Sequence, residues 1–198
     1  MEGDFSAAET HEITRILQEL RNRPELFNEK LFPLLYEPMR RMARRQMLGE
    51  SSARTLQPTL LVNEAYMRMF RQKGDYPDWK NRAHFMACAC NVLEQVLVDY
   101  ARKRLSHKRG GGAAHVPIED RPGHRTLSLD DILSIHEALG RLRALDATKA
   151  ELMKLKFFGG LTIQEAASVM GIGLTTAKEH LRSAQAWMNR ELGGGGSV

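Results

Sequence analysis

Polar and basic side chains within residues 174–183 have the types and spacing needed to contact nucleic acid. Thr162 is suited to cap a short helix, Gly171 permits a tight turn, and a second helix is predicted from Leu174 to Glu191. This order is typical of a helix-turn-helix, whose second helix brings its first residues to base edges in the major groove. The side chains expected on that outward face are Thr175, Thr176, Lys178, Glu179, Arg182 and Ser183.

A second basic group follows a longer helix, which is expected from about Arg82 past Arg104. The number of positive charges at the end of this helix exceeds what a favourable interaction with the helix dipole requires. Such a cluster of cations fits a phosphate backbone. The aromatic and histidine rings of the same helix can stack with unpaired bases, although each ring alone is more typical of a core position. The nucleic-acid contacts expected on this helix are His84, Tyr100, Arg102, Lys103, Arg104, Lys108 and Arg109.

The elements that must position these side chains are all predicted to be helices. Apolar residues recur at helical spacing, and alternating strand patterns are nearly absent, so the fold class is all-α. Asn81 and Asp146 are suited to cap helices, as is either Ser128 or Asp130. The expected helices lie near 11–20, 29–48, 58–70, 82–104, 129–142, 147–158, 162–170 and 174–191.

Glycine and proline between the two basic regions predict a linker. Gly110, Gly111 and Gly112 cannot continue a stable helix, and Pro117 and Pro122 follow without any apolar period. We therefore expect two small helical domains, 8–109 and 129–192, joined by a flexible linker, 110–128. Counted from Ser106 to Leu129, the stretch between the domains has about 24 residues. A coil of that length averages ~27 Å end to end and reaches ~80 Å when stretched, so it would join the domains without fixing them.

Composition excludes several classes of function. The 198 residues carry a net charge of +5, which favours a polyanionic partner. No apolar run is long enough to span a membrane, and the acidic amino terminus is unlike a secretory signal, so we expect a cytoplasmic protein with no membrane partner. Cys88 and Cys90 are spaced poorly for a disulfide and lack further metal ligands nearby, so neither a metal nor another cofactor is expected.

Several runs of residues occur in an order found in one protein family. They are 55–69, 81–85, 97–102, 108–111, 157–162 and 186–192. Together they resemble the extracytoplasmic-function (ECF) group of sigma-70-type RNA polymerase sigma factors, and the resemblance covers the chain from about residue 10 to residue 193. It implies that the first domain binds core RNA polymerase and reads and melts the −10 promoter element, whereas the second domain binds the −35 element.

The resemblance also assigns partners and contacts. It implies docking of the 55–69 run on the beta-prime clamp of the polymerase, contact with double-stranded promoter DNA and its melted strand, and an anti-sigma factor as a candidate regulator. No catalytic residues are implied. The side chains that match the polymerase-binding helix are Leu61, Asn63, Glu64, Met67 and Arg68.

Two other classes of function remain as alternatives. A stand-alone helix-turn-helix transcriptional regulator would account for the carboxyl-terminal helices, but a receiver domain would need strands that the sequence does not predict. An enzyme would need a Ser/His/Asp set, a phosphate loop, paired carboxylates or His-Asp doublets, and none of these patterns stands out. We therefore expect a non-enzymatic protein of transcription.

Overall fold

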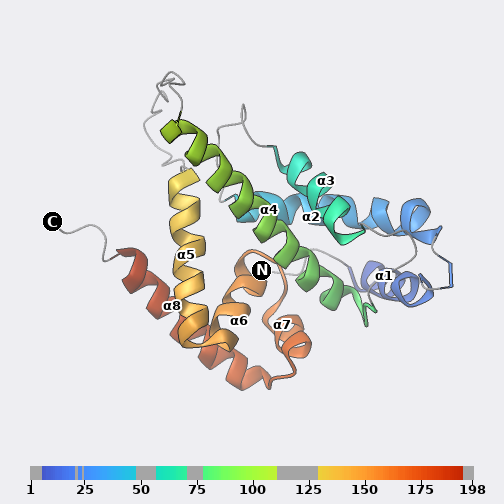
Figure 1. Cartoon of the computed structure of the whole chain (residues 1–198). Helices are drawn as coiled ribbons and strands as arrows, with labels where there is room; N and C mark the ends of the chain where they lie inside the picture. The colour runs from blue at the N-terminus through green and yellow to red at the C-terminus, as the bar shows by residue number, and fades with distance from the viewer. Residues whose placement is uncertain are drawn as a thin grey trace, which may run out of the picture.

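Every regular element in the described part of the chain is a helix. The computed structural model describes residues 6–20, 22–23, 25–47, 57–70, 78–110 and 129–193. Figure 1 shows long α4 crossing the molecule, with α1–α3 on one side and α5–α8 on the other. The all-α prediction is confirmed. The elements are α1 (Ala7–Glu19), the π-helix η1 (Phe27–Leu31), α2 (Phe32–Gln46), α3 (Pro58–Met69), α4 (Arg82–Gly110), α5 (Leu129–Leu145), α6 (Ala147–Phe157), α7 (Ile163–Met170) and α8 (Leu174–Gly193).

Local capping residues set where these helices begin. Ser6 and Glu9 form a capping box at α1, so that helix starts before the predicted residue 11. The Asn81 side chain accepts a hydrogen bond from the His84 backbone N–H at 2.9 Å, as expected for the start of α4. The Asp146 carboxylate accepts from the Lys149 backbone N–H at 3.0 Å and caps α6, which is also the predicted role.

The segment expected as one helix over 29–48 is divided in two. A short π-helix ends at Leu31, and α2 begins at Phe32 with Pro33 in its first turn. The backbone stays helical through Leu31 and Phe32, and the division is a change of hydrogen-bond pattern. Pro33, which has no backbone N–H to donate, lies just after this change. Pro38 lies buried inside α2.

The first module, residues 6–110, packs α1, α2 and α3 around α4. Its core combines aliphatic side chains with a chain of neighbouring rings, in which the centroids of Phe27 and Phe70 are 4.0 Å apart and those of Trp79 and Phe85 are 5.0 Å apart. Such ring pairs add to the stabilisation from buried apolar area. The largest fully buried side chains of this module are Ile13, Ile16, Leu20, Leu31, Leu35, Met39, Met42, Leu61, Phe85, Met86, Leu93 and Leu97.

The second module, residues 129–193, packs α5, α6, α7 and α8 together. Two glycines follow the end of α6 and allow the chain to turn there. A Cβ on Gly159 would lie 2.7 Å from the Leu155 carbonyl oxygen, and Gly160 has a φ of 69°. The chain therefore turns from α6 toward α7 without a steric clash.

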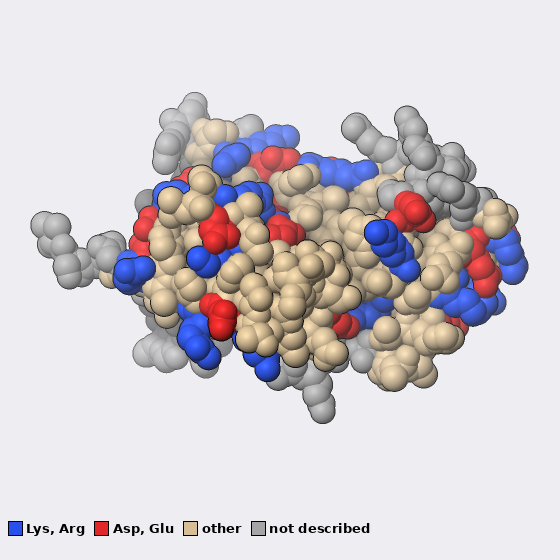
Figure 2. All heavy atoms as spheres, turned by 90° about the horizontal axis from the view of Figure 1, so that it is seen from below, with Lys and Arg blue, Asp and Glu red and all other residues tan. Residues whose placement is uncertain are grey.

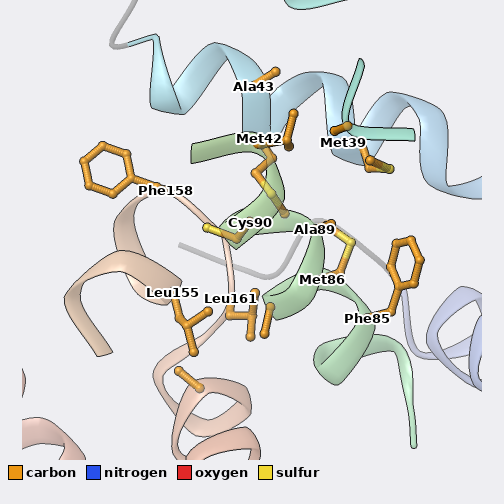
Figure 3. Close-up of a cluster of buried hydrophobic side chains, with 14 of the residues drawn as sticks. Met39, Met42, Ala43, Phe85, Met86, Ala89, Cys90, Leu155, Phe158 and Leu161 are labelled. Carbon is orange, nitrogen blue, oxygen red and sulfur yellow. The ribbon is translucent and has the colours of Figure 1, made fainter. Parts of the chain in front are cut away.

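The two modules also pack against each other. Figure 3 shows Met86, Ala89 and Cys90 of α4 beside Leu155 and Leu161 of the second module. Both leucines and Cys90 are essentially inaccessible to solvent. The described residues of both modules therefore join in one hydrophobic core, a contact that the sequence did not predict. The predicted linker, 110–128, lies outside the described residues apart from Gly110, which ends α4.

Candidate nucleic-acid interface

The turn between α7 and α8 has the geometry of a helix-turn-helix. The Thr162 hydroxyl accepts a hydrogen bond from the Glu165 backbone N–H at 3.2 Å, and one Glu165 carboxylate oxygen accepts from the Thr162 backbone N–H at 2.8 Å. Gly171 ends α7 in the left-handed conformation, with φ of 67°, and the Ile172 N–H donates back to the Ala167 carbonyl. These bonds satisfy both ends of α7 and fix the direction in which α8 leaves.

Substitution of Gly171 tests this turn. Gly171→Ala is expected to lower the free energy of unfolding by about 1 kcal/mol, because a left-handed φ is costly for a residue with a Cβ. No atom lies within 4 Å of a Cβ at this position, so the loss is one of backbone conformation alone. Gly171→Asn should lose less, because asparagine tolerates this region. Urea unfolding measures both variants, and equal losses would contradict the assignment.

The predicted recognition face of α8 is fully available to a partner. Ala177, Ala184 and Met188 are buried and hold α8 on its own module. Lys178 and Arg182 form no ion pair within the described residues. The Lys178 ammonium and the Arg182 guanidinium are therefore available to phosphate or base oxygens. The structure places all six predicted side chains on the exposed surface: Thr175, Thr176, Lys178, Glu179, Arg182 and Ser183.

Charge on this side of the molecule is mixed. Figure 2, which views the molecule from the side where α8 lies, shows Lys and Arg interspersed with Asp and Glu around a broad uncharged area. The described surface seen there carries no single extended positive field. Attraction to DNA must therefore come from few cations, which favours binding that depends on a second contact elsewhere.

The side chains predicted to contact the −10 element lie toward opposite ends of α4. His84 is in the first turn, where it is half-buried and its Nδ1 accepts from the Lys80 backbone N–H at 3.3 Å. Arg102, Lys103 and Arg104 are exposed near the other end, about 27–30 Å away along the helix at 1.5 Å per residue. Tyr100 is half-buried and packs against the core. The structure thus separates His84 from the basic group.

Two of the predicted cations cannot be placed. The side chains of Lys108 and Arg109 lie outside the described residues. The described basic group on α4 therefore consists of Arg102, Lys103 and Arg104.

The exposed face of α3 is partly apolar. Leu60 and Met67 are 57% and 61% exposed, and they lie seven residues apart on one side of the helix. Asn63 and Glu64, also exposed, lie between them. Leu61, which the sequence placed among the polymerase contacts, is only 1% exposed and belongs to the core. Leu60 was not among the predicted side chains, although its spacing from Met67 puts both on the same exposed side of the helix.

Arg68, another predicted contact, is held in place on this face. Its Nε donates to Glu64 at 3.0 Å, and its Nη1 donates to Asp99 of α4 at 2.9 Å. These bonds link α3 to α4 and leave Glu64 partly neutralised. The face therefore presents an apolar pair beside a small, ordered network of charges.

A buried group of charges lies where α4 meets α5 and α6. Glu94 contacts His136 Nδ1 at 3.2 Å and Lys154 Nζ at 3.5 Å, and Lys154 also contacts Glu151 at 2.7 Å. Burial opposes ionisation of Glu94, but the hydrogen bond with His136 and the charge of Lys154 outweigh it, so the pKa of Glu94 lies below its ordinary value. Sequence patterns did not indicate this group, because its members come from distant segments.

The two cysteines belong to the packing of α4. Burial raises the pKa of Cys88, and it raises that of Cys90 to about 12. No group of three or more His, Cys, Asp or Glu side chains in the described residues is arranged to hold a metal ion. Because their raised pKa values favour the protonated thiol over the reactive thiolate, both cysteines are poor nucleophiles.

Alkylation tests the burial of Cys90. Because burial raises the pKa of Cys90 to about 12, its thiol should stay protonated at pH 8. Iodoacetamide should therefore leave Cys90 unmodified in the folded chain and modify both cysteines in guanidinium chloride. Mass spectrometry of the peptides reads out the result, and rapid labelling of Cys90 in the folded chain would contradict its position in the core.

These features define a class of protein: an all-helical chain whose terminal helix-turn-helix leaves its recognition helix open to DNA. The family model for the ECF sigma factor matches residues 10–194, nearly the whole chain, and the protein belongs to this family. Membership supports a role as an RNA polymerase sigma factor in transcription initiation; sigma factors are initiation factors rather than enzymes. Searches among curated proteins and solved structures found no match to the chain.

Within the described residues, none of the helices combines the length and the apolar character required to cross a membrane.

Proposed function

We propose that this chain binds core RNA polymerase through α3 and directs it to promoters, with α8 on the −35 element and α4 on the −10 element. The observation that carries the proposal is the recognition helix, whose six predicted contacts are all exposed while its opposite side is buried. Family membership supplies the polymerase as partner. The proposed place of action is the cytoplasm, where polymerase and promoter DNA meet.

The exposed side chains of each surface suit the partner that we assign to it. Leu60 and Met67 offer exposed apolar area, which suits a protein surface better than DNA. Lys178 and Arg182 suit the major groove, and Arg102 with its two basic neighbours suits the phosphates of a melted strand. An anti-sigma factor would act by covering either α3 or α8.

Transcription in vitro tests the proposal. Core polymerase should start transcripts on fragmented genomic DNA from the source organism only when the chain is added. Lys178→Ala combined with Arg182→Ala should reduce those starts while leaving the helical content unchanged, because both residues are exposed. Starts that do not depend on the chain would contradict the proposed function.

Salt dependence tests the basic group of α4. Replacing Arg102, Lys103 and Arg104 by alanine should lower the slope of log K against log salt for promoter binding by the holoenzyme by about 2–3, at 0.7–0.9 per phosphate contact. A matched control replaces Arg15, Arg23 and Lys30, which are exposed on the first module. The control should keep the original slope. An unchanged slope in the α4 variant would reject the phosphate contacts.

A further inference from the structure

Met67 of α3 is the most exposed methionine in the described part of the chain. Its exposed fraction is 61%, whereas the other described methionines are buried in the core or half-buried. Those methionines are Met39, Met42, Met47, Met69, Met86, Met153, Met170 and Met188. A small reagent dissolved in water therefore reaches the thioether of Met67 more readily than that of any other described methionine.

The position of Met67 on α3 is set by the opposite side of the helix. Leu61, Val62 and Ala65 are buried and hold α3 against the core. Met67 lies on the outer side with Leu60, so its sulfur belongs to no part of the folded core. Leucine at both positions would offer similar apolar area to a partner. What methionine adds is a sulfur atom that oxidants attack.

The thioether of methionine reacts with a peroxide without first losing a proton. Its sulfur lone pair attacks one peroxide oxygen, and the S–O bond forms as the O–O bond breaks. The proton of the attacked oxygen moves to the departing oxygen, which leaves as water. The sulfur loses two electrons and the peroxide gains them. Access to the sulfur therefore decides the rate. The thiols of Cys88 and Cys90 differ, because their raised pKa values keep them protonated in weak acid.

The sulfoxide product is poorly matched to an apolar partner. Its oxygen is a hydrogen-bond acceptor that stays hydrated, and burying such a group without a donor costs free energy. Three residues before Met67, the Glu64 carboxylate is itself an acceptor, and it is bonded to Arg68 Nε at 3.0 Å. Arg68 Nη1 donates to Asp99 at 2.9 Å. These charges are bonded to one another, so an oxidised Met67 would bring its water into the interface.

We propose that Met67 is a site of reversible oxidation, at which a peroxide converts the thioether to a sulfoxide and weakens the binding of α3 to core RNA polymerase. The proposal rests on the proposed function for the identity of that partner. A methionine sulfoxide reductase reverses the modification with two thiols as the reductant. The thiols become a disulfide, and the sulfoxide oxygen leaves as water. Binding to polymerase then responds to the oxidant through one exposed sulfur atom.

Peroxide treatment of the full chain tests the selectivity of the site. Hydrogen peroxide is applied at pH 5 and removed with catalase, and mass spectrometry of the peptides follows each methionine and cysteine. Met67 should be oxidised at least about tenfold faster than Met39, Met86 or Met188, which are nearly inaccessible to solvent. Circular dichroism should show unchanged helical content, because a sulfoxide at this exposed position displaces nothing in the core.

Binding to core polymerase tests the consequence of oxidation. At neutral pH the oxidised chain should bind at least about tenfold more weakly than the untreated chain, equal to about 1.4 kcal/mol. Methionine sulfoxide reductases for both sulfoxide epimers, supplied with dithiothreitol, should restore the affinity. Dithiothreitol alone should not, because it reduces oxidised thiols and leaves sulfoxides intact. Recovery that requires the reductases assigns the effect to methionine rather than to Cys88 or Cys90.

Two variants assign the effect to one methionine. Met67→Leu is compared with itself before and after peroxide, and its affinity for polymerase should not change on treatment. Met69→Leu is the matched control, since Met69 lies on the same helix but is half-buried against the core. It should lose affinity on oxidation as the wild-type chain does. In the preformed complex, core polymerase should protect Met67 from peroxide.

Different results overturn the oxidation site and the proposed function. Oxidation that does not favour Met67, or full polymerase binding by chains that carry the Met67 sulfoxide, would overturn the oxidation site and leave the proposed function intact. The same conclusion follows if Met67→Leu loses as much affinity on oxidation as the wild-type chain. If the untreated chain fails to bind polymerase, the proposed function is contradicted, and the effect assigned to oxidation falls with it.

Discussion

Replacing Leu60 and Met67 together by aspartate is expected to weaken binding to core RNA polymerase at least about a hundredfold, because two exposed apolar anchors would be lost from α3. Burial of one such side chain in an interface contributes about 1.5–3 kcal/mol, so the pair contributes about 3–6 kcal/mol. Both side chains are more than half exposed in the free chain. The variant should therefore fold normally, which isolates the effect on binding.

A matched control for this variant lies on the second module. Leu145 and Leu192 are 70% and 42% exposed, and neither is on α3. Their replacement by aspartate adds the same charge and removes comparable apolar area, yet should leave polymerase binding through α3 intact. Equal affinity losses in the two double variants would show that general surface charge, rather than the α3 face, governs binding.

Lys154→Met is expected to be the most destabilising of the substitutions considered, lowering the free energy of unfolding by about 3 kcal/mol. The ammonium group is almost fully buried between Glu94 and Glu151. Its removal leaves those carboxylates close together with less compensating charge. Glu94→Gln in the same chain should recover part of the loss, because the buried negative charge disappears with its partner. Chemical unfolding of the wild type, the two single variants and the double variant measures the coupling between Lys154 and Glu94. Strictly additive losses of unfolding free energy would contradict that coupling.

The pH dependence of stability provides a separate test of Glu94. Its pKa is lowered in the folded chain, so it contributes stability above its unfolded pKa of about 4.5. That contribution should disappear as the pH falls from 4.5 through the folded pKa. Glu94→Gln should show a shallower loss of melting temperature over this acidic range. Identical acid profiles for both proteins would contradict the lowered pKa.

Much of the second module could be predicted because its signals are local. Thr162 caps α7 as predicted, in a capping box with Glu165 three residues later. Gly171 provides the predicted tight turn by adopting the left-handed conformation. Asp146 caps α6 as predicted. In each case the deciding interaction joins residues within one helical turn, so the sequence itself carries the necessary spacing.

The packing of one module on the other had no such signal. Arg82 and Glu165 are 83 residues apart, and Glu94 and His136 are 42 apart. Arginine at the start of a helix and a histidine on an apolar face have many ordinary explanations in a sequence. Only the three-dimensional arrangement shows that they meet, so the shared core was not predicted.

The exposed apolar face of α3 was predicted only in part. The family resemblance assigned polymerase binding to α3, and Met67 of that helix is exposed. It also selected Leu61, which the structure buries, instead of Leu60. Adjacent leucines on a helix point about 100° apart, so a shift of one residue exchanges a buried position for an exposed one.

Binding of the full chain to purified bacterial core RNA polymerase tests the central claim most directly. On a sizing column, the chain should co-elute with core polymerase at one copy per enzyme, and the Leu60 and Met67 double aspartate variant should elute separately. If the wild-type chain stays free at micromolar concentration while binding DNA by itself, the sigma-factor account is contradicted and a stand-alone helix-turn-helix regulator takes its place.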